Sequence, residues 1–436
     1  MNKNMRYVAI MMVGLLILGC VSFFKNLNST GKKYEESIAL ANKAYKKEIY
    51  VDAVDYYEDA LEVEPSHIDT YIKLANSYMK LGNSNQYESV LKKAIDQDDT
   101  NAKPYVALAE YYASSESYDK SYEILRSATN VKDKKQIKKL QKEYSSYYKT
   151  YGGTFTDIKQ WKDGFIAVKD GELWGLIDNE ASESITPVYN EIGAFDEDES
   201  VTPVKQGNEW YYIDKNGYKK LVGDHSYDYL GSFCNGYAPA SYKGKYGWID
   251  REFEEYHFEY DDVTPFKNGV AAAKKGKKWA LINTKFKAIT DFKYSNVKLD
   301  ENDFCSSGGI IFAKQSGKYI MLNTKGKRIG NLKFDDAKPF VTEQYAAVKK
   351  GKKWGYVDDE GKLVIKYKYN DAKSFANGVA GVKEKSSWGL INQNGKEVVD
   401  SMFDDIGSMN SKGTIFVKNA NIWQCIGLYA YMNCDD

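Results

Sequence analysis

The pattern of hydrophobic and polar positions divides the chain into three stretches of different character. An apolar run fills much of residues 1–30, residues 34–150 repeat apolar and small residues with the period of a helix, and residues from 155 onward alternate apolar and polar positions between glycine turns. A period of 3.6 residues predicts amphipathic helices, and a period of two predicts antiparallel strands. The pattern therefore predicts a helical region followed by an all-β region.

The helical stretch repeats itself every 34 residues, as in SIALANKAYKKEIY, TYIKLANSYMKLGN and PYVALAEYYASSES. Small residues let helices approach closely, and leucine or aromatic columns fill the space between successive pairs. One column holds Leu40, Leu74 and Leu108, followed by Ala41, Ala75 and Ala109, and another holds Tyr57, Leu91 and Leu125, followed three residues later by Ala60, Ala94 and Ala128. The repeat predicts a stack of antiparallel helix pairs.

This period and pattern resemble tetratricopeptide (TPR) repeats, most closely in the first unit, where Ala53, Tyr57, Ala60 and Pro65 match. The resemblance covers residues 34–150 as three units, with a polar capping helix at residues 136–148. It implies that peptides bind to a concave face lined by the first helix of each pair. The positions that would line this face are Asn42, Lys46, Asn76, Lys80 and Lys103. The alternative is that these side chains only form solvated helix faces.

Residues 155–436 contain eight copies of one β unit. Each copy has an alternating run, a turn, a second alternating run opened by an aromatic residue, a glycine turn and a third short strand. These aromatic residues are spaced 33 to 40 residues apart: Trp174, Trp210, Tyr246, Trp279, Tyr319, Trp354, Trp388 and Trp423. Between units, segments such as YDDVTPF and FDDAKPF recur, and we expect them to turn the chain into the next unit. The repeat predicts eight three-stranded units with large rings at fixed structural positions.

The β region resembles WG-repeat (KWG-type) proteins, a bacterial β-repeat family. Trp174-Gly175, Trp354-Gly355 and Trp388-Gly389 retain the pair that gives the family its name, and Gly247-Trp248 inverts it. No common catalytic residue or cofactor is implied by this resemblance. The whole chain is thus expected to be an α+β multidomain repeat protein, a TPR solenoid followed by eight WG units. We prefer a propeller-like ring for these units, and an open β-solenoid capped by the decayed last unit is the alternative.

The first 30 residues have the anatomy of an export signal. Lys3 and Arg6 precede an apolar core, and the residues leading into Cys20 resemble the lipobox at which bacterial lipoprotein signals are cut and the cysteine is lipidated. Without cleavage, residues 8–24 form a 17-residue apolar run at the short end of a membrane span. Both interpretations predict a cell-membrane anchor with the folded part on the extracytoplasmic side.

Candidate chemistry is sparse. Basic and acidic residues balance at 61 each, which disfavours nucleic acid as a partner. His67, His225 and His257 lack partners at metal-ligand spacing, and acidic pairs such as those at 261–262 fit no calcium loop, so we expect no metal and no other cofactor. An exported chain permits disulfides, and Cys425 with Cys434 is the candidate pair.

The two repeat arrays predict extended interaction surfaces. We expect a non-catalytic scaffold of the cell envelope that binds peptides or envelope proteins through both arrays. The alternative is a protein that binds cell-wall polysaccharide or a hydrolase of wall polymers. A hydrolase should have one unit that breaks the repeat with unexpected polar residues, and the units differ in the sequence only by decay at the chain end.

Overall fold

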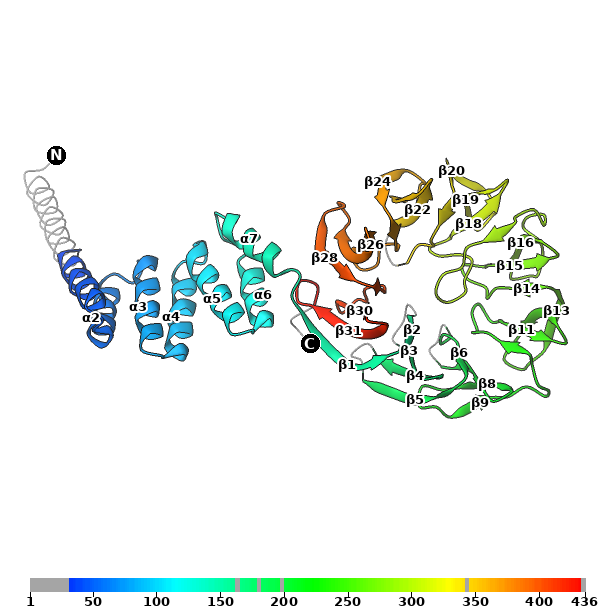
Figure 1. The fold of residues 1–436 in the computed structure, drawn as a ribbon, viewed down its shortest axis with the longest axis horizontal. Helices are drawn as coiled ribbons and strands as arrows, with labels where there is room; N and C mark the ends of the chain where they lie inside the picture. Colours follow the sequence, from blue (N-terminus) through cyan, green and yellow to red (C-terminus); the bar gives the residue numbers. More distant parts are fainter. Residues whose placement is uncertain (1–30, 161–164, 179–181, 197–199, 342–344, 433–436) are drawn as a thin grey trace, which may run out of the picture. The chain divides into compact units, whose positions relative to one another are not determined.

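The computed structural model describes residues 31–160, 165–178, 182–196, 200–341 and 345–432. The chain divides into two compact units, Met1–Tyr144 and Ser145–Asp436. The first is helical and the second is built of β-sheets (Figure 1). The predicted anchor with Cys20, and Cys434 of the predicted disulfide, lie outside the described residues. None of the helices in the described ranges is long and apolar enough to cross a membrane.

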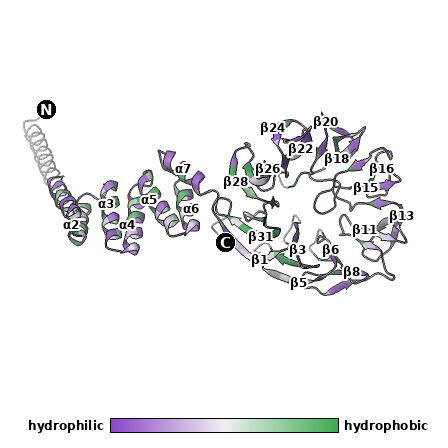
Figure 2. Ribbon diagram, in the orientation of Figure 1, coloured by the Kyte–Doolittle hydropathy of each residue, from purple (hydrophilic) through white to green (hydrophobic). Residues whose placement is uncertain are grey.

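The helical unit consists of consecutive helices joined by short turns. Residues 31–46 are helical, and the helices that follow are α2 (Tyr50–Val63), α3 (Ile68–Lys80), α4 (Ser84–Gln97), α5 (Ala102–Ser114), α6 (Tyr118–Ser127) and α7 (Lys135–Tyr144). Figure 2 shows hydrophilic and hydrophobic residues mixed along these helices, as expected of amphipathic elements. The helix predicted as a cap at residues 136–148 is α7, and it ends at Tyr144.

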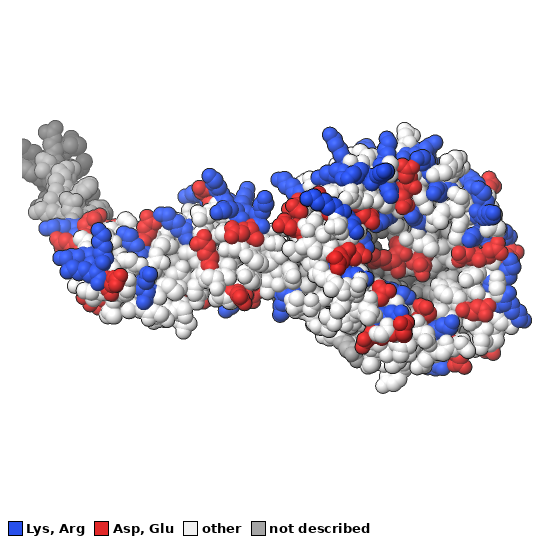
Figure 3. All heavy atoms as spheres, viewed as in Figure 1, with Lys and Arg blue, Asp and Glu red and all other residues white. Residues whose placement is uncertain are grey.

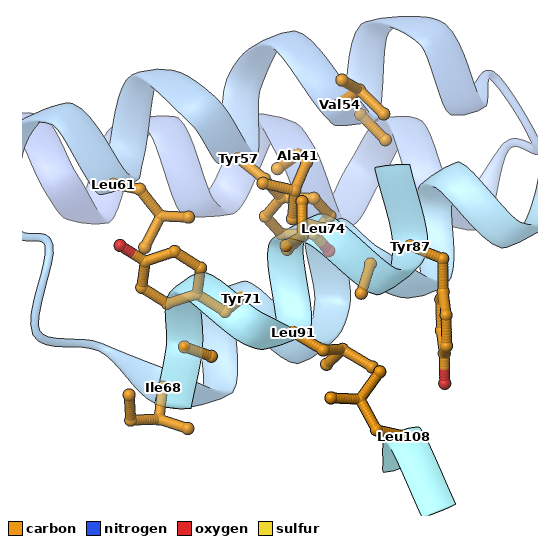
Figure 4. Close-up of a cluster of buried hydrophobic side chains, with 14 of the residues drawn as sticks. Ala41, Val54, Tyr57, Leu61, Ile68, Tyr71, Leu74, Tyr87, Leu91 and Leu108 are labelled. Carbon is orange, nitrogen blue, oxygen red and sulfur yellow. The ribbon is translucent and has the colours of Figure 1, made fainter. Parts of the chain in front are cut away.

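The core of the helical unit is built from the predicted columns, with one exception (Figure 4). Ala41, Ala75 and Ala109 are fully buried, which fits the close approach of neighbouring helices. Leu40 is 46% exposed, although Leu74 and Leu108 of the same column are buried. Leu74 lies beside the preceding helix pair, whereas no described helix precedes the one that carries Leu40. The prediction for Leu40 was therefore wrong because the first unit has no neighbour on that side among the described residues.

The β unit forms a ring of eight sheets, so the propeller-like prediction is confirmed and the open solenoid is not formed (Figure 1). We call the sheets blades 1 to 8. The strands of blades 1 to 4 are β2 (Asp157–Gln160), β3 (Phe165–Asp170), β4 (Leu173–Asp178) and β5 (Glu183–Tyr189); β6 (Glu191–Ile192), β7 (Thr202–Gln206), β8 (Glu209–Ile213) and β9 (Lys219–Leu221); β10 (Tyr229–Leu230), β11 (Ala238–Tyr242), β12 (Lys245–Ile249) and β13 (Glu255–Tyr260); and β14 (Asp262–Val263), β15 (Val270–Lys275) and β16 (Lys278–Asn283). The strands of blades 5 to 8 are β17 (Asn296–Val297), β18 (Ile310–Gln315), β19 (Lys318–Asn323) and β20 (Arg328–Phe334); β21 (Asp336–Ala337), β22 (Ala346–Lys350), β23 (Lys353–Val357) and β24 (Leu363–Tyr369); β25 (Asp371–Ala372), β26 (Val379–Glu384), β27 (Ser387–Asn392) and β28 (Glu397–Phe403); and β29 (Asp405–Ile406), β30 (Thr414–Asn419), β31 (Ile422–Leu428) and β1 (Tyr148–Phe155).

Seven of the eight blades have four strands, one more than the sequence predicts. The additional strand comes from the segment between units, which was expected only to turn the chain. Its two central residues pair with the next strand, as Glu191 and Ile192 of β6 do with Lys205 and Val204 of β7. A two-residue strand is too short to show alternation, which is why the sequence pattern did not reveal it.

The ring is closed by its own first strand. Strand β1 pairs antiparallel with β31, with Tyr148 opposite Leu428 and Phe155 opposite Trp423. The β unit therefore starts at Ser145, and the predicted boundary at residue 155 lies too late in the chain. The last unit is a complete blade rather than a cap, because the chain start supplies its fourth strand.

The Trp-Gly pair is explained by the path of the last strand of the blade. In blade 6, Trp354 pairs with Tyr369 and Tyr356 pairs with Ile365. The chain therefore advances by two residues on β23 and by four residues on β24 between these two pairs. This bulge brings the β24 backbone so close that a methyl group at Gly355 would lie 2.5 Å from the carbonyl oxygen of Ile365.

The same close approach occurs at Gly175, Gly247 and Gly389. In blade 3 the glycine follows Tyr246, so the predicted inversion at Gly247-Trp248 is a Tyr-Gly pair in the usual position, followed by a buried tryptophan. In blade 5 the last strand, β20, advances by five residues between the equivalent pairs instead of four, and Ile320 occupies the glycine position. The glycine is therefore required where the bulge is tight.

We predict that Gly355→Ala lowers the free energy of unfolding by about 1–3 kcal/mol, because the added methyl group meets backbone that cannot rotate away. Chemical denaturation of the full chain measures this change. Gly153→Ala on β1 is the matched control, since its nearest atom would be Phe155 Cζ at 3.7 Å, an ordinary contact. Equal losses in the two variants would contradict this explanation of the pair.

Candidate functional site

The predicted peptide-binding positions of the helical unit divide into two groups. Asn42 Oδ1 accepts hydrogen bonds from Tyr57 Oη at 2.9 Å and from Lys73 Nζ at 3.2 Å. Lys103 Nζ forms an ion pair with Asp69 at 2.5 Å. These contacts join the first helices of successive pairs, so Asn42 and Lys103 already have partners within the protein.

The other three predicted positions are available to a ligand. The side chains of Lys46, Asn76 and Lys80 are exposed. Within the described part of the chain, no hydrogen bond or ion pair engages them. Lys80 follows Asn76 by one helical turn on α3, and Lys46 follows Asn42 by one turn on the helix of residues 31–46. The first helices therefore present two unpaired ammonium groups and one unpaired amide.

The centre of the β ring contains a second candidate site, lined by the short first strands of the blades. In four blades a lysine stands two residues after the first residue of this strand, and we call Lys159, Lys298, Lys338 and Lys373 the inner lysines. Each inner lysine pairs with the acidic residue that begins the first strand of the next blade: Lys159–Glu191 at 3.5 Å, Lys298–Asp336 at 2.7 Å, Lys338–Asp371 at 3.1 Å and Lys373–Asp405 at 3.5 Å.

Each inner lysine also lies over the repeat aromatic ring of its own blade. The distances from Nζ to the ring centroid are 4.6 Å at Trp174, 5.0 Å at Tyr319, 5.0 Å at Trp354 and 5.4 Å at Trp388. An ammonium group between a ring face and a carboxylate is stabilised by both. Burial lowers the pKa of Lys338, although Asp371 opposes this shift.

Glycine replaces the inner lysine in blades 2, 3 and 8, at Gly193, Gly231 and Gly407. Trp210 of blade 2 and Trp423 of blade 8, which have no inner lysine, border a cavity of about 560 Å³ at the ring centre. Lys418 of strand β30 lies over the ring of Trp423, with its Nζ 5.6 Å from the ring centroid. Trp423 is only 7% exposed, and the indole Nε1 of each tryptophan is buried without a hydrogen-bond partner. Two unpartnered donors at one cavity mark an incomplete polar environment.

An acidic loop from blade 5 lines the same cavity. It consists of Asp300, Glu301, Asn302 and Asp303, and Figure 3 shows acidic side chains gathered around the hollow of the ring. Asp300 holds the loop, because its carboxylate accepts hydrogen bonds from the backbone N–H groups of Asn302 and Phe304 and from Ser307 Oγ. Glu301 and Asp303 are both exposed side chains of this loop.

The carboxyl groups of this loop are difficult to ionise. Enclosure by the inner wall of the ring raises the pKa of Glu301 to about 7; the charge of Lys373 opposes this shift, and Asp300 adds to it. The pKa of Asp303 is also raised by burial, against the charge of Lys159 and with that of Asp300 and Asp262. The loop therefore places the carboxyl groups of Glu301 and Asp303 where their charged form is less stable than in bulk water.

This acidic loop was missed by the sequence reasoning, which found no unit with unexpected polar residues. The signal was the spacing of 40 residues between Trp279 and Tyr319, the widest in the series. In blade 5, Asp300 occupies the position where other units carry a phenylalanine, as at Phe340 and Phe375, and Phe304 comes four residues later. The extra residues form the loop that enters the ring.

The remaining predicted positions serve the packing of the blades. Trp174, Trp279, Tyr319, Trp354 and Trp388 are buried along with Trp423, while Trp210 and Tyr246 are half-buried. Cys425 is buried within blade 8. In the described ranges, no group of three histidine, cysteine or acidic side chains could hold a metal ion.

We predict that Glu301→Gln stabilises the protein more at pH 8 than at pH 4. The folded chain holds this proton more tightly than the unfolded chain, whose pKa lies near 4.5, so the contribution of Glu301 to stability falls as the pH rises from about 4.5 to about 7. Urea denaturation of wild type and variant across this range measures the difference. Glu252→Gln, on an exposed outer turn, should show no such trend, and a constant difference for Glu301→Gln would contradict the assignment.

Comparison with known proteins separates the two units. The family model described as WG containing repeat matches residues 174–210, 246–279, 321–354, 354–386 and 388–423. Each match begins at a repeat aromatic residue or two residues after it, and ends at the next repeat aromatic residue or two residues before it. The matches cover five stretches of the ring.

The curated relatives are DnaJ homologues. The chain is 32% identical to human DnaJ homolog subfamily C member 7 over 127 residues, which are 26% of this chain and 25% of that protein. It is 28% identical to the Dictyostelium discoideum DnaJ homolog subfamily C member 3 homolog over 106 residues, which are 23% of this chain and 20% of that protein. The chain thus spans about a quarter or less of the length of these relatives.

The chain is also similar to solved structures, among them two TPR domains. The crystal structure of MamA protein aligns with a TM-score of 0.23 and 24% identity over 27% of this chain and 64% of that chain. The Arabidopsis OM64 TPR domain aligns with a TM-score of 0.23 and 23% identity over 26% and 95%. The TPR2B domain of yeast Sti1, solved as a complex with pHsp70, aligns with a TM-score of 0.22 and 22% identity over 25% and 93%. The C-terminal region of this chain contains stretches that match the WG-containing repeat, and its N-terminal region is similar to TPR domains.

Proposed function

We propose that this protein is a non-catalytic interaction scaffold of the cell envelope, held at the membrane by its N-terminal segment, whose helical unit binds the C-terminus of a partner protein. The observation that carries this proposal is the set of unpaired side chains on the first helices, Lys46, Asn76 and Lys80. Two ammonium groups and an amide suit a carboxylate ligand, because all three supply hydrogen-bond donors.

The contacts of the neighbouring residues support this proposal. Asn42 is fixed by Tyr57 and Lys73, and Lys103 is fixed by Asp69, so the helices that carry the free groups are joined across their shared face. A ligand that meets pre-positioned helices loses less conformational entropy on binding. The membrane anchor is supported by the signal-like sequence that ends in Cys20. The proposed partners are therefore envelope proteins or peptides with an accessible C-terminus.

We predict that the double variant Lys46→Ala, Lys80→Ala binds a peptide with a free C-terminal carboxylate at least about tenfold more weakly than wild type, because two charge-assisted contacts are lost. Fluorescence anisotropy of a labelled peptide ending in aspartate measures the affinity. An amidated twin of this peptide should lose affinity for the wild type to a similar extent. Lys93→Ala, an exposed lysine on the second helix of its pair, is the control. Equal binding of the free and amidated peptides would exclude carboxylate recognition.

A further inference from the structure

We propose that the central cavity of the β ring binds a lysine or arginine side chain of a partner peptide, and that in blade 8, where Gly407 has no side chain, the cationic group takes the position that an inner lysine takes in other blades. This inference goes beyond the proposed function, since it concerns the β unit and does not depend on the helical unit. It rests on a comparison of the blades with one another.

Four blades show what blade 8 lacks. In blade 7, Lys373 Nζ lies 5.4 Å from the centroid of Trp388 and 3.5 Å from Asp405 of blade 8. The equivalent groups around Gly407 are the ring of Trp423 and the carboxylate of Asp157, which begins the first strand of blade 1. Blade 8 and blade 1 therefore supply the ring and the carboxylate at the equivalent repeat positions, and among the described residues no inner lysine lies at the position between them.

The backbone around this position matches that of the blades with inner lysines. Gly407 N–H donates to the carbonyl of Phe416 at 2.8 Å, and Lys298 N–H donates to the carbonyl of Phe312 at 2.9 Å. Asp157 Oδ1 accepts from the N–H of Ile158 at 2.9 Å, as Asp405 Oδ1 does from the N–H of Ile406 at 2.8 Å. Blade 8 therefore keeps the frame of the cation site without its cation.

The charge of the cavity favours a positively charged occupant. Its lining includes the carboxylates of Glu191, Asp300, Glu301 and Asp303 but only the ammonium groups of Lys159 and Lys373. A cation would offset this excess, whereas an anionic ligand would be repelled.

The size of the cavity is consistent with one side chain and its backbone. A volume of about 560 Å³ accommodates a small ligand but not a folded domain. The partner must therefore present the basic residue on an extended segment or an exposed loop. The rest of the segment would lie over the mouth of the ring.

The test is a calorimetric titration of the full chain with two heptapeptides. Both have uncharged residues on either side of the central position, which is lysine in one peptide and norleucine in the other. We expect the lysine peptide to bind at least tenfold more tightly than its norleucine twin. Gly407→Lys should weaken binding of the lysine peptide at least tenfold, because the new side chain would occupy the proposed cation site. The substitution fits the backbone, since blade 5 has a lysine, Lys298, at the same position, opposite Phe312 where blade 8 has Phe416. Asn394→Lys is the control, since the equivalent turn position in blade 5 is Lys325, and it should change binding less than twofold.

Asp157→Asn provides a second variant should Gly407→Lys fail to fold as judged by circular dichroism and thermal unfolding. Its amide oxygen can still accept the N–H of Ile158, so only the charge is lost, and we expect at least threefold weaker binding. The proposal is overturned if neither peptide binds the wild type, if both bind equally, or if the folded variants bind as the wild type does. A neutral glucose oligosaccharide provides the competing ligand. The proposal is also overturned if this oligosaccharide binds, the lysine peptide does not, and Gly407→Lys abolishes binding of the oligosaccharide.

Discussion

The β unit depends on the pairing of its two ends. Every blade except the last is made from consecutive residues, and the last is completed by β1 from the start of the unit. Without this pairing, β31 would have an open edge and the ring would lack its closing contact. The cavity at the centre exists only because the ring is closed, since its lining comes from blades that are distant in sequence.

The repeat aromatic residue links packing to function. In six blades its ring is buried, and in four of these an inner lysine above it forms an ion pair with the next blade. In blade 8 the ring of Trp423 is buried and also borders the cavity. The same repeat position thus joins neighbouring blades where an inner lysine is present and borders the central cavity in blade 8, where glycine replaces that lysine.

The period, the number of units and the aromatic column could be predicted from the sequence, because large rings and glycine turns recur at fixed spacing. The two-residue first strands and the closure by β1 could not, since both are set by pairing between distant residues and leave no local pattern. The role of Gly355 became clear only from the bulge on β24. In the helical unit, Asn42 and Lys103 are half-exposed or exposed on the first helices, and their contacts with Lys73 and Asp69 could not be predicted because these residues are distant in sequence.

The inner lysines also bear on how such a ring can change during evolution. Blade 7 begins with Asp371, which pairs with Lys338, and carries Lys373, which pairs with Asp405. A second copy of blade 7 would place another Asp371 at the position of Asp405, so every inner lysine would still have a carboxylate partner. A blade that both begins with an acidic residue and carries an inner lysine can therefore be copied without leaving an inner charge unpaired.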